Sequence, residues 1–442
     1  AYLLPGAPKV SDFDGKVTAY VDDFEAAQTA VDISSPLTWS LSSTPIGFGG
    51  ELANNDLAYN YNRAKLAWYT IDPVFYSSQR PEGINDEDLS SPFTRRVFRD
   101  EIFPDQDIIQ GQTQALFTLD LAYYPTQRGE YNFNPAASGG NTLPNPETRF
   151  GGVMRQLTTT DFERSNVEYI QFWIMDPFIY PENSNNNGGK LTFNLGNISE
   201  DVLKDGRKQY ENGLPEDGSD FNTISTEWGK VPSNQSLVYT FNTSGDQRTN
   251  QDIGFDGLND AQEVAMYPSF GGLPDPANDN YEYFLQAEGT ILERYLRYNG
   301  TQGNSPEQVT NTNRGNNAQP DVEDINRDNT MNTVDSYFEY EIDLFPGMDV
   351  ESGKYITDVK EISVTTQDNR DIPVRWVQFR LPLSEFDRAV NGISDFRSIR
   401  FMRMFMSGFD QETILRMGTL ELFRGDYRRY TESLDLTGED NS

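Results

Sequence analysis

Short runs in which apolar and polar residues alternate recur along most of the chain. Residues 115–124 alternate cleanly and stop at Pro125, as a half-buried β-strand does. Residues 169–175 are almost entirely apolar, which indicates a strand buried on both faces. The pattern predicts strands at residues 17–24, 37–41, 63–75, 115–124, 154–158, 169–175, 190–195, 237–241, 336–344, 359–366, 374–381, 398–406 and 413–423.

Helical patterns are few and short. Ser199 is placed to cap a short helix that Gly213 would stop, with acidic residues in its first turn and basic residues near its end. Residues 281–298 are a second helical candidate, and residues 382–393 fit a short helical connection. The chain is therefore expected to be mainly β.

Two stretches of the chain echo each other. Asp161-Phe-Glu precedes the strand at 169–175, and Asp395-Phe-Arg precedes the strand at 398–406; a polar loop then leads to a second strand in both. Chance similarity between two β-strand regions is the alternative explanation of this echo. We favour two related β-sandwich domains of the jelly-roll, galactose-binding-like type. Their predicted extents are residues 1–221 and residues 222–250 with 336–430, with an inserted calcium-binding segment at 251–335 and a tail at 431–442.

Residues 252–263 fit the twelve-position calcium loop. Acidic residues occupy positions 1, 5, 9 and 12, Gly257 supplies the turn at position 6, and only position 3 departs, with Gly254. Alternate carboxylates in such a loop converge on one point, and calcium takes six to eight oxygen ligands. The candidate ligands are Asp252, Asp256, Asp260 and Glu263.

The same spacing returns at residues 324–335. Asn329 replaces the turn glycine, and asparagine tolerates the left-handed conformation needed there. The candidate ligands of this second loop are Asp324, Asn326, Asp328, Asn332 and Asp335. Solvated turns in a chain with 69 acidic residues are the alternative reading, but two matches flanking one segment favour structural Ca²⁺ as the cofactor.

Composition narrows the possible functions. The formal net charge of −34 argues against nucleic acid as a partner, because phosphate binding needs clustered lysine and arginine. The chain contains neither histidine nor cysteine, which removes serine–histidine triads, cysteine nucleophiles and most zinc sites. Catalysis would have to depend on carboxylates such as Asp22, Asp23 and Glu25, and we expect no enzyme activity.

A glycan-binding module is the main alternative function. Tryptophan side chains would then serve as stacking platforms for sugar rings, and Trp39 and Trp68 are the candidates. Buried tryptophans of the core are the competing explanation, which applies most strongly to Trp173 in its apolar run.

Several long motifs resemble one protein family. They occupy residues 54–69, 119–135, 160–178 and the loop at 252–263. Together these motifs are similar to the SprA (Sov) family of gliding-motility and secretion proteins, and the resemblance extends over nearly the whole chain.

The resemblance implies a soluble, cap-like portion of a much larger protein, the outer-membrane translocon of the type IX secretion system. The implied location is the extracellular face of the outer membrane. The implied partners are the rest of the parent translocon barrel, accessory proteins such as PorV and a plug protein, and the secreted cargo proteins. The role expected from the resemblance is structural.

Overall fold

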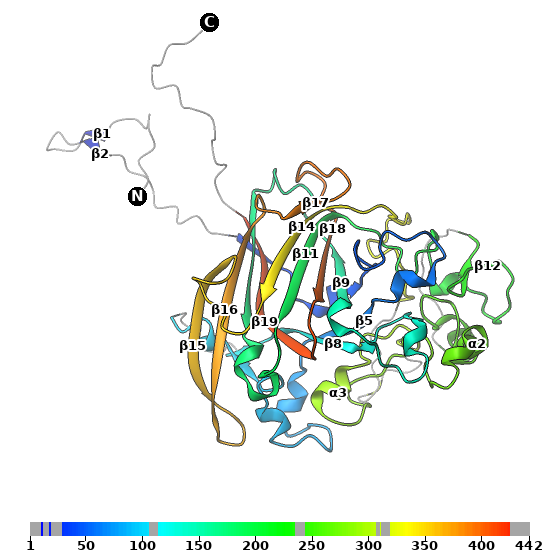
Figure 1. Ribbon diagram of the computed structural model, residues 1–442, viewed down its shortest axis with the longest axis horizontal. Coiled ribbons are helices and arrows are strands. Elements are labelled where there is room, and N and C mark those ends of the chain that lie inside the picture. Colours follow the sequence, from blue (N-terminus) through cyan, green and yellow to red (C-terminus); the bar gives the residue numbers. More distant parts are fainter. Residues whose placement is uncertain are drawn as a thin grey trace, which may run out of the picture.

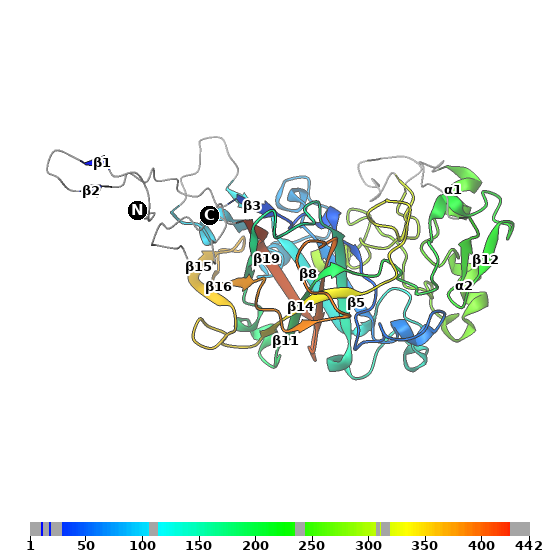
Figure 2. The same ribbon diagram turned by 90° about the horizontal axis from the view of Figure 1, so that it is seen from above.

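The computed structural model describes residues 10–11, 17–18, 29–105, 114–234, 244–305, 310 and 319–424. A β-sandwich forms the centre of the described structure, and a segment with short helices lies at one end of it (Figures 1 and 2). No helix in this part of the chain combines the length and hydropathy needed to span a bilayer.

Two antiparallel sheets form the sandwich (Figure 1). The seven-stranded sheet runs, in order, through β15 (Ile356–Thr365), β16 (Asp371–Pro382), β10 (Val167–Met175), β19 (Thr413–Arg424), β8 (Leu119–Arg128) and β5 (Ala64–Tyr69), and β3 (Thr29–Asp32) also pairs with β19. The six-stranded sheet runs through β17 (Arg388–Ala389), β14 (Ser336–Leu344), β11 (Gly189–Asn197), β18 (Phe401–Ser407), β9 (Phe150–Gln156) and β4 (Ser40–Leu41).

Three two-residue or three-residue ladders accompany the large sheets. They pair β1 (Val10–Ser11) with β2 (Val17–Thr18), β6 (Val97–Phe98) with β7 (Ala115–Leu116), and β12 (Thr223–Ser225) with β13 (Lys230–Pro232). The α-helices are α1 (Gly245–Gln251), α2 (Asp260–Met266) and α3 (Ile291–Tyr295).

The main core fills the space between the two sheets. Phe172 of β10 lies 5.1 Å from Phe379 of the adjacent strand and 5.5 Å from Phe193 of the opposite sheet, measured between ring centroids. Ile170 and Ile174 point into the same core, whereas their neighbours on β10 face the other way. The alternation of each strand therefore selects the side chains that join the two sheets.

The outer face of the seven-stranded sheet is also covered. Trp173 and Met175 join a second core beneath residues 71–103 and 281–298. Tyr295 of α3 stacks on Tyr69 of β5 at 4.3 Å. The prediction that 169–175 is buried on both faces is therefore confirmed.

The predicted mainly β, sandwich-like fold is confirmed. The strands, however, do not separate into the two sandwiches that the sequence predicts. β10 pairs with β16 and β19, and β11 pairs with β14 and β18. Strands assigned to a first and a second sandwich thus alternate within the same two sheets. The physical reason is that alternation shows which residues form a strand but not which distant strand supplies its hydrogen bonds.

The predicted helices are largely absent from the described residues. At 199–213 only a 3₁₀ turn forms, Glu211–Gly213, because the Asp201 carboxylate accepts the N–H groups of Asp205 and Gly206 and holds a turn instead. Of 281–298 only α3 is α-helical, starting at the Thr290 cap. Residues 382–393 contain β17 rather than a helix, and the strand predicted at 237–241 lies outside the described residues.

Candidate metal centre and neighbouring pocket

The first predicted calcium loop lies between two short helices. α1 ends at Gln251, and α2 begins at Asp260, where the Asn259 side chain accepts the N–H of Gln262 as a helix cap. Gly254 and Gly257 between them have positive φ angles of 79° and 68°, a conformation that favours glycine. The local sequence thus folds the loop tightly and brings its acids inward.

Five carboxylates gather beside this loop. One oxygen from each of Asp256, Glu263 and Asp279 lies within 4.8 Å of the others, and the same holds for Asp260, Glu263 and Asp275. Glu263 belongs to both groups. Asp256, Glu263 and Asp279 are 1%, 0% and 0% exposed, so their carboxylates lie almost completely out of water.

The hydrogen bonds of these acids leave some oxygens without a partner. Asp256 accepts the N–H of Leu258 with Oδ1 (2.9 Å), and its buried Oδ2 has no hydrogen-bond partner. Glu263 accepts the N–H of Ala277 with Oε2 (2.7 Å), and its buried Oε1 has none. Both carboxylate oxygens of Asp279 are buried without a partner.

Burial, and after it the charges of neighbouring acids, disfavours ionisation of the carboxyl groups in the cluster. Burial raises the pKa of Glu263 to about 8, and the charges of Asp275 and Asp260 act in the same direction. Burial also raises the pKa of Asp256 and of Asp279 well above the ordinary aspartate value. Each shift reports a carboxylate deprived of water and placed beside others of its kind.

Positive charge near the cluster is scarce. Arg128 interacts with the charges of Asp275 and Glu263, but its Nη1 donates to the carbonyl oxygens of Asn132 (2.7 Å) and Pro276 (2.6 Å). Among the residues with described side chains, no lysine or arginine forms an ion pair with any of the five acids. The cluster therefore keeps a surplus of negative charge.

The structure brings together three of the four acids predicted in the first loop. Asp252 lies to one side, where its Oδ2 accepts the Ser305 N–H and approaches Arg248 at 3.4 Å. Asp275 and Asp279 were missed by sequence reasoning. Asp275-Pro-Ala-Asn-Asp279-Asn280 has the Asp-x-x-x-Asp-Asn spacing of residues 324–329, so a search for that shorter pattern could have found them.

The second predicted loop is arranged differently. Both oxygens of Asp324 accept backbone N–H groups, from Asp328 and Asn329, and Lys208 lies 3.9 Å away. Asp328 forms an ion pair with Arg400 at 2.6 Å. The carboxylate oxygens of Asp324 and Asp328 are therefore paired with donors of the chain itself.

The remaining predicted ligands of the second loop face other groups. Asn332 donates its side-chain amide to the carbonyl oxygen of Ile198, and Asn326 accepts the N–H of Asp328. Asp335 accepts the N–H of Ser199. In the described part of the chain these side chains do not join a group of three acids around one point.

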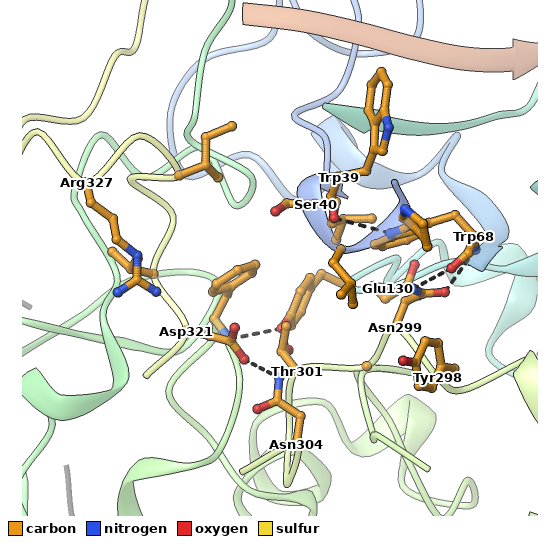
Figure 3. A pocket seen from close by; sticks show the side chains of 18 residues that line it. Trp39, Ser40, Trp68, Glu130, Tyr298, Asn299, Thr301, Asn304, Asp321 and Arg327 are labelled. Carbon is orange, nitrogen blue, oxygen red and sulfur yellow. Dashed lines mark hydrogen bonds between the residues drawn. The ribbon is translucent and has the colours of Figure 1, made fainter. Parts of the chain in front are cut away.

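A pocket of about 370 Å³ lies between the sandwich and the inserted segment, and it contains both tryptophans proposed for glycan stacking (Figure 3). Trp39 and Trp68 are only 4% and 5% exposed. Their indole N–H groups donate to the carbonyl oxygens of Ile33 and Trp39. The Asn299 side chain accepts the backbone N–H of Trp68 and donates to its carbonyl oxygen.

The candidate catalytic acids Asp22, Asp23 and Glu25 lie outside the described residues.

The fold and the acid cluster together define a β-sandwich protein with an acidic inserted segment. Residues 256–442 match the model of a family described as motility related/secretion protein (SprA N-terminal). This match supports the resemblance to the SprA family that the sequence motifs predict. No curated protein matches the chain.

Proposed function

We propose that this chain is a structural, non-catalytic part of a protein-secretion and motility apparatus. The family match over residues 256–442 is the observation that carries the proposal. More specifically, the chain would form a cap-like wall on the extracellular face of the type IX outer-membrane translocon. Its partners would be the parent barrel, PorV, a plug protein and passing cargo.

The topology suits a rigid wall attached at one place. Thr29 at the start of β3 pairs with Arg424 at the end of β19, so the chain enters and leaves the sandwich at neighbouring positions. A compact unit with adjacent ends can be carried by a larger protein through a narrow stem. Because strands from both halves share both sheets, bending the unit would require breaking either a sheet or its core.

The absence of histidine and cysteine supports a non-catalytic role, since the usual general base and the strongest nucleophile are missing. The net charge of −34 supports a solvated surface that repels anionic envelope components and passengers.

Excision from the full-length protein tests the proposal. Because residues 29 and 424 are neighbours, residues 30–423 can be replaced by a short glycine-serine linker without separating the flanking segments. Secreted proteins in the medium are expected to fall while the shortened protein still reaches the membrane. A matched variant, Phe221→Ala at a position 74% exposed, should secrete normally. Unchanged secretion after excision would rule out the proposed role.

A glycan-binding function is the second candidate, and the shared pocket of Trp39 and Trp68 is the observation that favours it. Both ring systems are too buried to stack openly on a sugar, so binding would depend on the partly buried Tyr298 in the same pocket. Sugar-specific binding on a glycan array, abolished by Tyr298→Ala, would favour this function over the structural one.

A further inference from the structure

The acid cluster combines features that separate a cation site from an ordinary group of acids. Five carboxylates from two chain segments, residues 256–263 and 275–279, meet beside the α1–α2 loop. Asp256, Glu263 and Asp279 are almost completely buried, and each has at least one carboxylate oxygen without a hydrogen-bond partner. A buried carboxylate oxygen without a partner is costly, so a missing positive partner is the simplest explanation.

Neighbouring acids of this chain provide an internal comparison. Glu323 is also buried, yet its oxygens accept the N–H groups of Val202, Leu203 and Gln209. Asp201 likewise bonds two backbone N–H groups. The fold can therefore satisfy buried acids with its own amides, yet it leaves one oxygen of Asp256, one of Glu263 and both of Asp279 without a hydrogen-bond partner.

The backbone at Gly254 passes very close to the carboxylate of Asp279. A Cβ atom at Gly254 would lie 2.2 Å from Asp279 Oδ2, so only glycine lets the loop approach this carboxylate. In addition, Asp256 and Glu263 each use one oxygen to bind a backbone N–H, which fixes the direction of the other. The second oxygens are thus held in place before any ligand arrives.

We propose that a calcium ion binds between these two segments, held by Asp256, Glu263 and Asp279, with Asp260 and Asp275 completing a shell of oxygen ligands. Hard carboxylate oxygens favour calcium or magnesium over transition metals. Calcium is the better fit, because magnesium retains several waters and the three central acids are almost inaccessible to solvent.

The ion has a mechanical consequence for the insert. Tyr131, just after β8, donates its backbone N–H to the Ala277 carbonyl at 2.7 Å, and its hydroxyl accepts the Phe255 N–H at 2.9 Å. Tyr131 by itself therefore contacts both the loop that carries Asp256 and the turn that carries Asp279. Calcium joins those segments to each other and, through Tyr131, to the sandwich. This inference does not depend on the secretion role.

Calorimetry and thermal unfolding of the 442-residue chain, after removal of divalent ions by a chelator, test the proposal. Calcium should raise the unfolding temperature by several degrees and magnesium by much less. Asp279→Asn and Glu263→Gln should each weaken calcium binding by about tenfold or more, because each removes a ligand charge. Neither variant should unfold the calcium-free protein, since each relieves repulsion.

Asp328→Asn is the matched control. It removes one acidic charge from the second loop, where the side chain pairs with Arg400, and should keep the full calcium response. Hydrogen exchange provides a second readout, with calcium protecting residues 252–280 in the wild type and in the control only. A calcium-insensitive wild type, an equal response to magnesium, or an Asp279→Asn variant with wild-type affinity would overturn the proposal.

Discussion

The backbone N–H of Phe162 donates to the carbonyl oxygen of Phe396 at 2.9 Å. These two residues occupy matching positions in the two echoed motifs, Asp161-Phe and Asp395-Phe. The strands that follow the motifs pair as well, β10 with β19 in one sheet and β11 with β18 in the other. The repeated units therefore form the centre of one sandwich together, instead of each forming a sandwich of its own.

This central pairing predicts a single cooperative unfolding transition for the sandwich. Phe172→Ala should destabilise the protein by about 3–5 kcal/mol, because Phe172 is fully buried between the sheets against Phe193 and Phe379. Denaturant unfolding followed by two independent probes would measure it. Phe221→Ala, on the surface, should change stability by less than about 0.5 kcal/mol. Two separated transitions would contradict the single-sandwich arrangement.

A second prediction concerns the layer that covers the seven-stranded sheet. Arg95 and Glu101 form a buried two-pronged ion pair with distances of 2.8 and 2.7 Å, and Glu101 also accepts the Trp376 indole N–H. Glu101→Ala leaves the guanidinium buried and unpaired, so a loss of about 3–5 kcal/mol is expected in denaturant unfolding. The exposed pair of Arg80 and Asp86 is the control: Asp86→Ala should cost less than about 1 kcal/mol. Similar losses for both variants would show that burial does not set the strength of these pairs.

The sequence predicts the strands well and their partners poorly. Alternation is a local property, and β5, β8, β10, β11, β14, β16, β18 and β19 all overlap runs predicted from it. Phe172 pairs with Phe379, however, more than two hundred positions later. Nothing in the local pattern of either strand specifies that partner, so the division into domains could not be derived.

At the acid site, too, the sequence predicts what lies within one loop but not what reaches the site from distant segments. Asp256, Asp260 and Glu263 follow one spacing rule within a single loop, and the rule found them. Asp279 reaches the site from a separate turn. At the second loop the spacing is equally good, but Lys208 and Arg400 arrive from distant segments and occupy its acids. The spacing identifies acids that can converge on one point. The local sequence does not show whether lysine or arginine side chains from distant segments pair with those acids.

A third prediction concerns pH, measured in chelator. Burial, together with the charges of Asp324 and Asp328, raises the pKa of Glu200 from 4.5 to about 7. The folded state therefore holds this proton more tightly than the unfolded state does. The contribution of Glu200 to stability is complete below pH 4.5 and is lost as pH rises to about 7. The difference between a pKa of 4.5 and one of about 7 corresponds to roughly 3 kcal/mol.

Glu200→Gln isolates this contribution, because glutamine does not ionise. The free energy of unfolding between pH 5 and pH 8 should fall by roughly 2.5 kcal/mol less in the variant than in the wild type. Glu412→Gln, at a less buried acid whose pKa burial also raises, serves for comparison and should change the profile less. Parallel profiles for wild type and Glu200→Gln would show that Glu200 is not the titrating group.

The last prediction uses the glycine that faces the acid cluster. Gly254 has a φ of 79°, and a Cβ atom there would meet the carboxylate of Asp279 at 2.2 Å. Gly254→Ala should therefore destabilise the chain by more than about 1 kcal/mol and also lower its calcium affinity, because relief of the clash displaces Asp279.

Gly139→Ala is the matched change: a Cβ atom there meets nothing within 4 Å, and its φ is not in the left-handed region. That variant should be neutral or slightly more stable, by up to about 1 kcal/mol, with unchanged calcium affinity. Calorimetric titration and thermal unfolding of both variants separate the two effects. A Gly254→Ala protein that loses stability but binds calcium normally would place the ion away from Asp279, and would limit the clash to a strain of the loop.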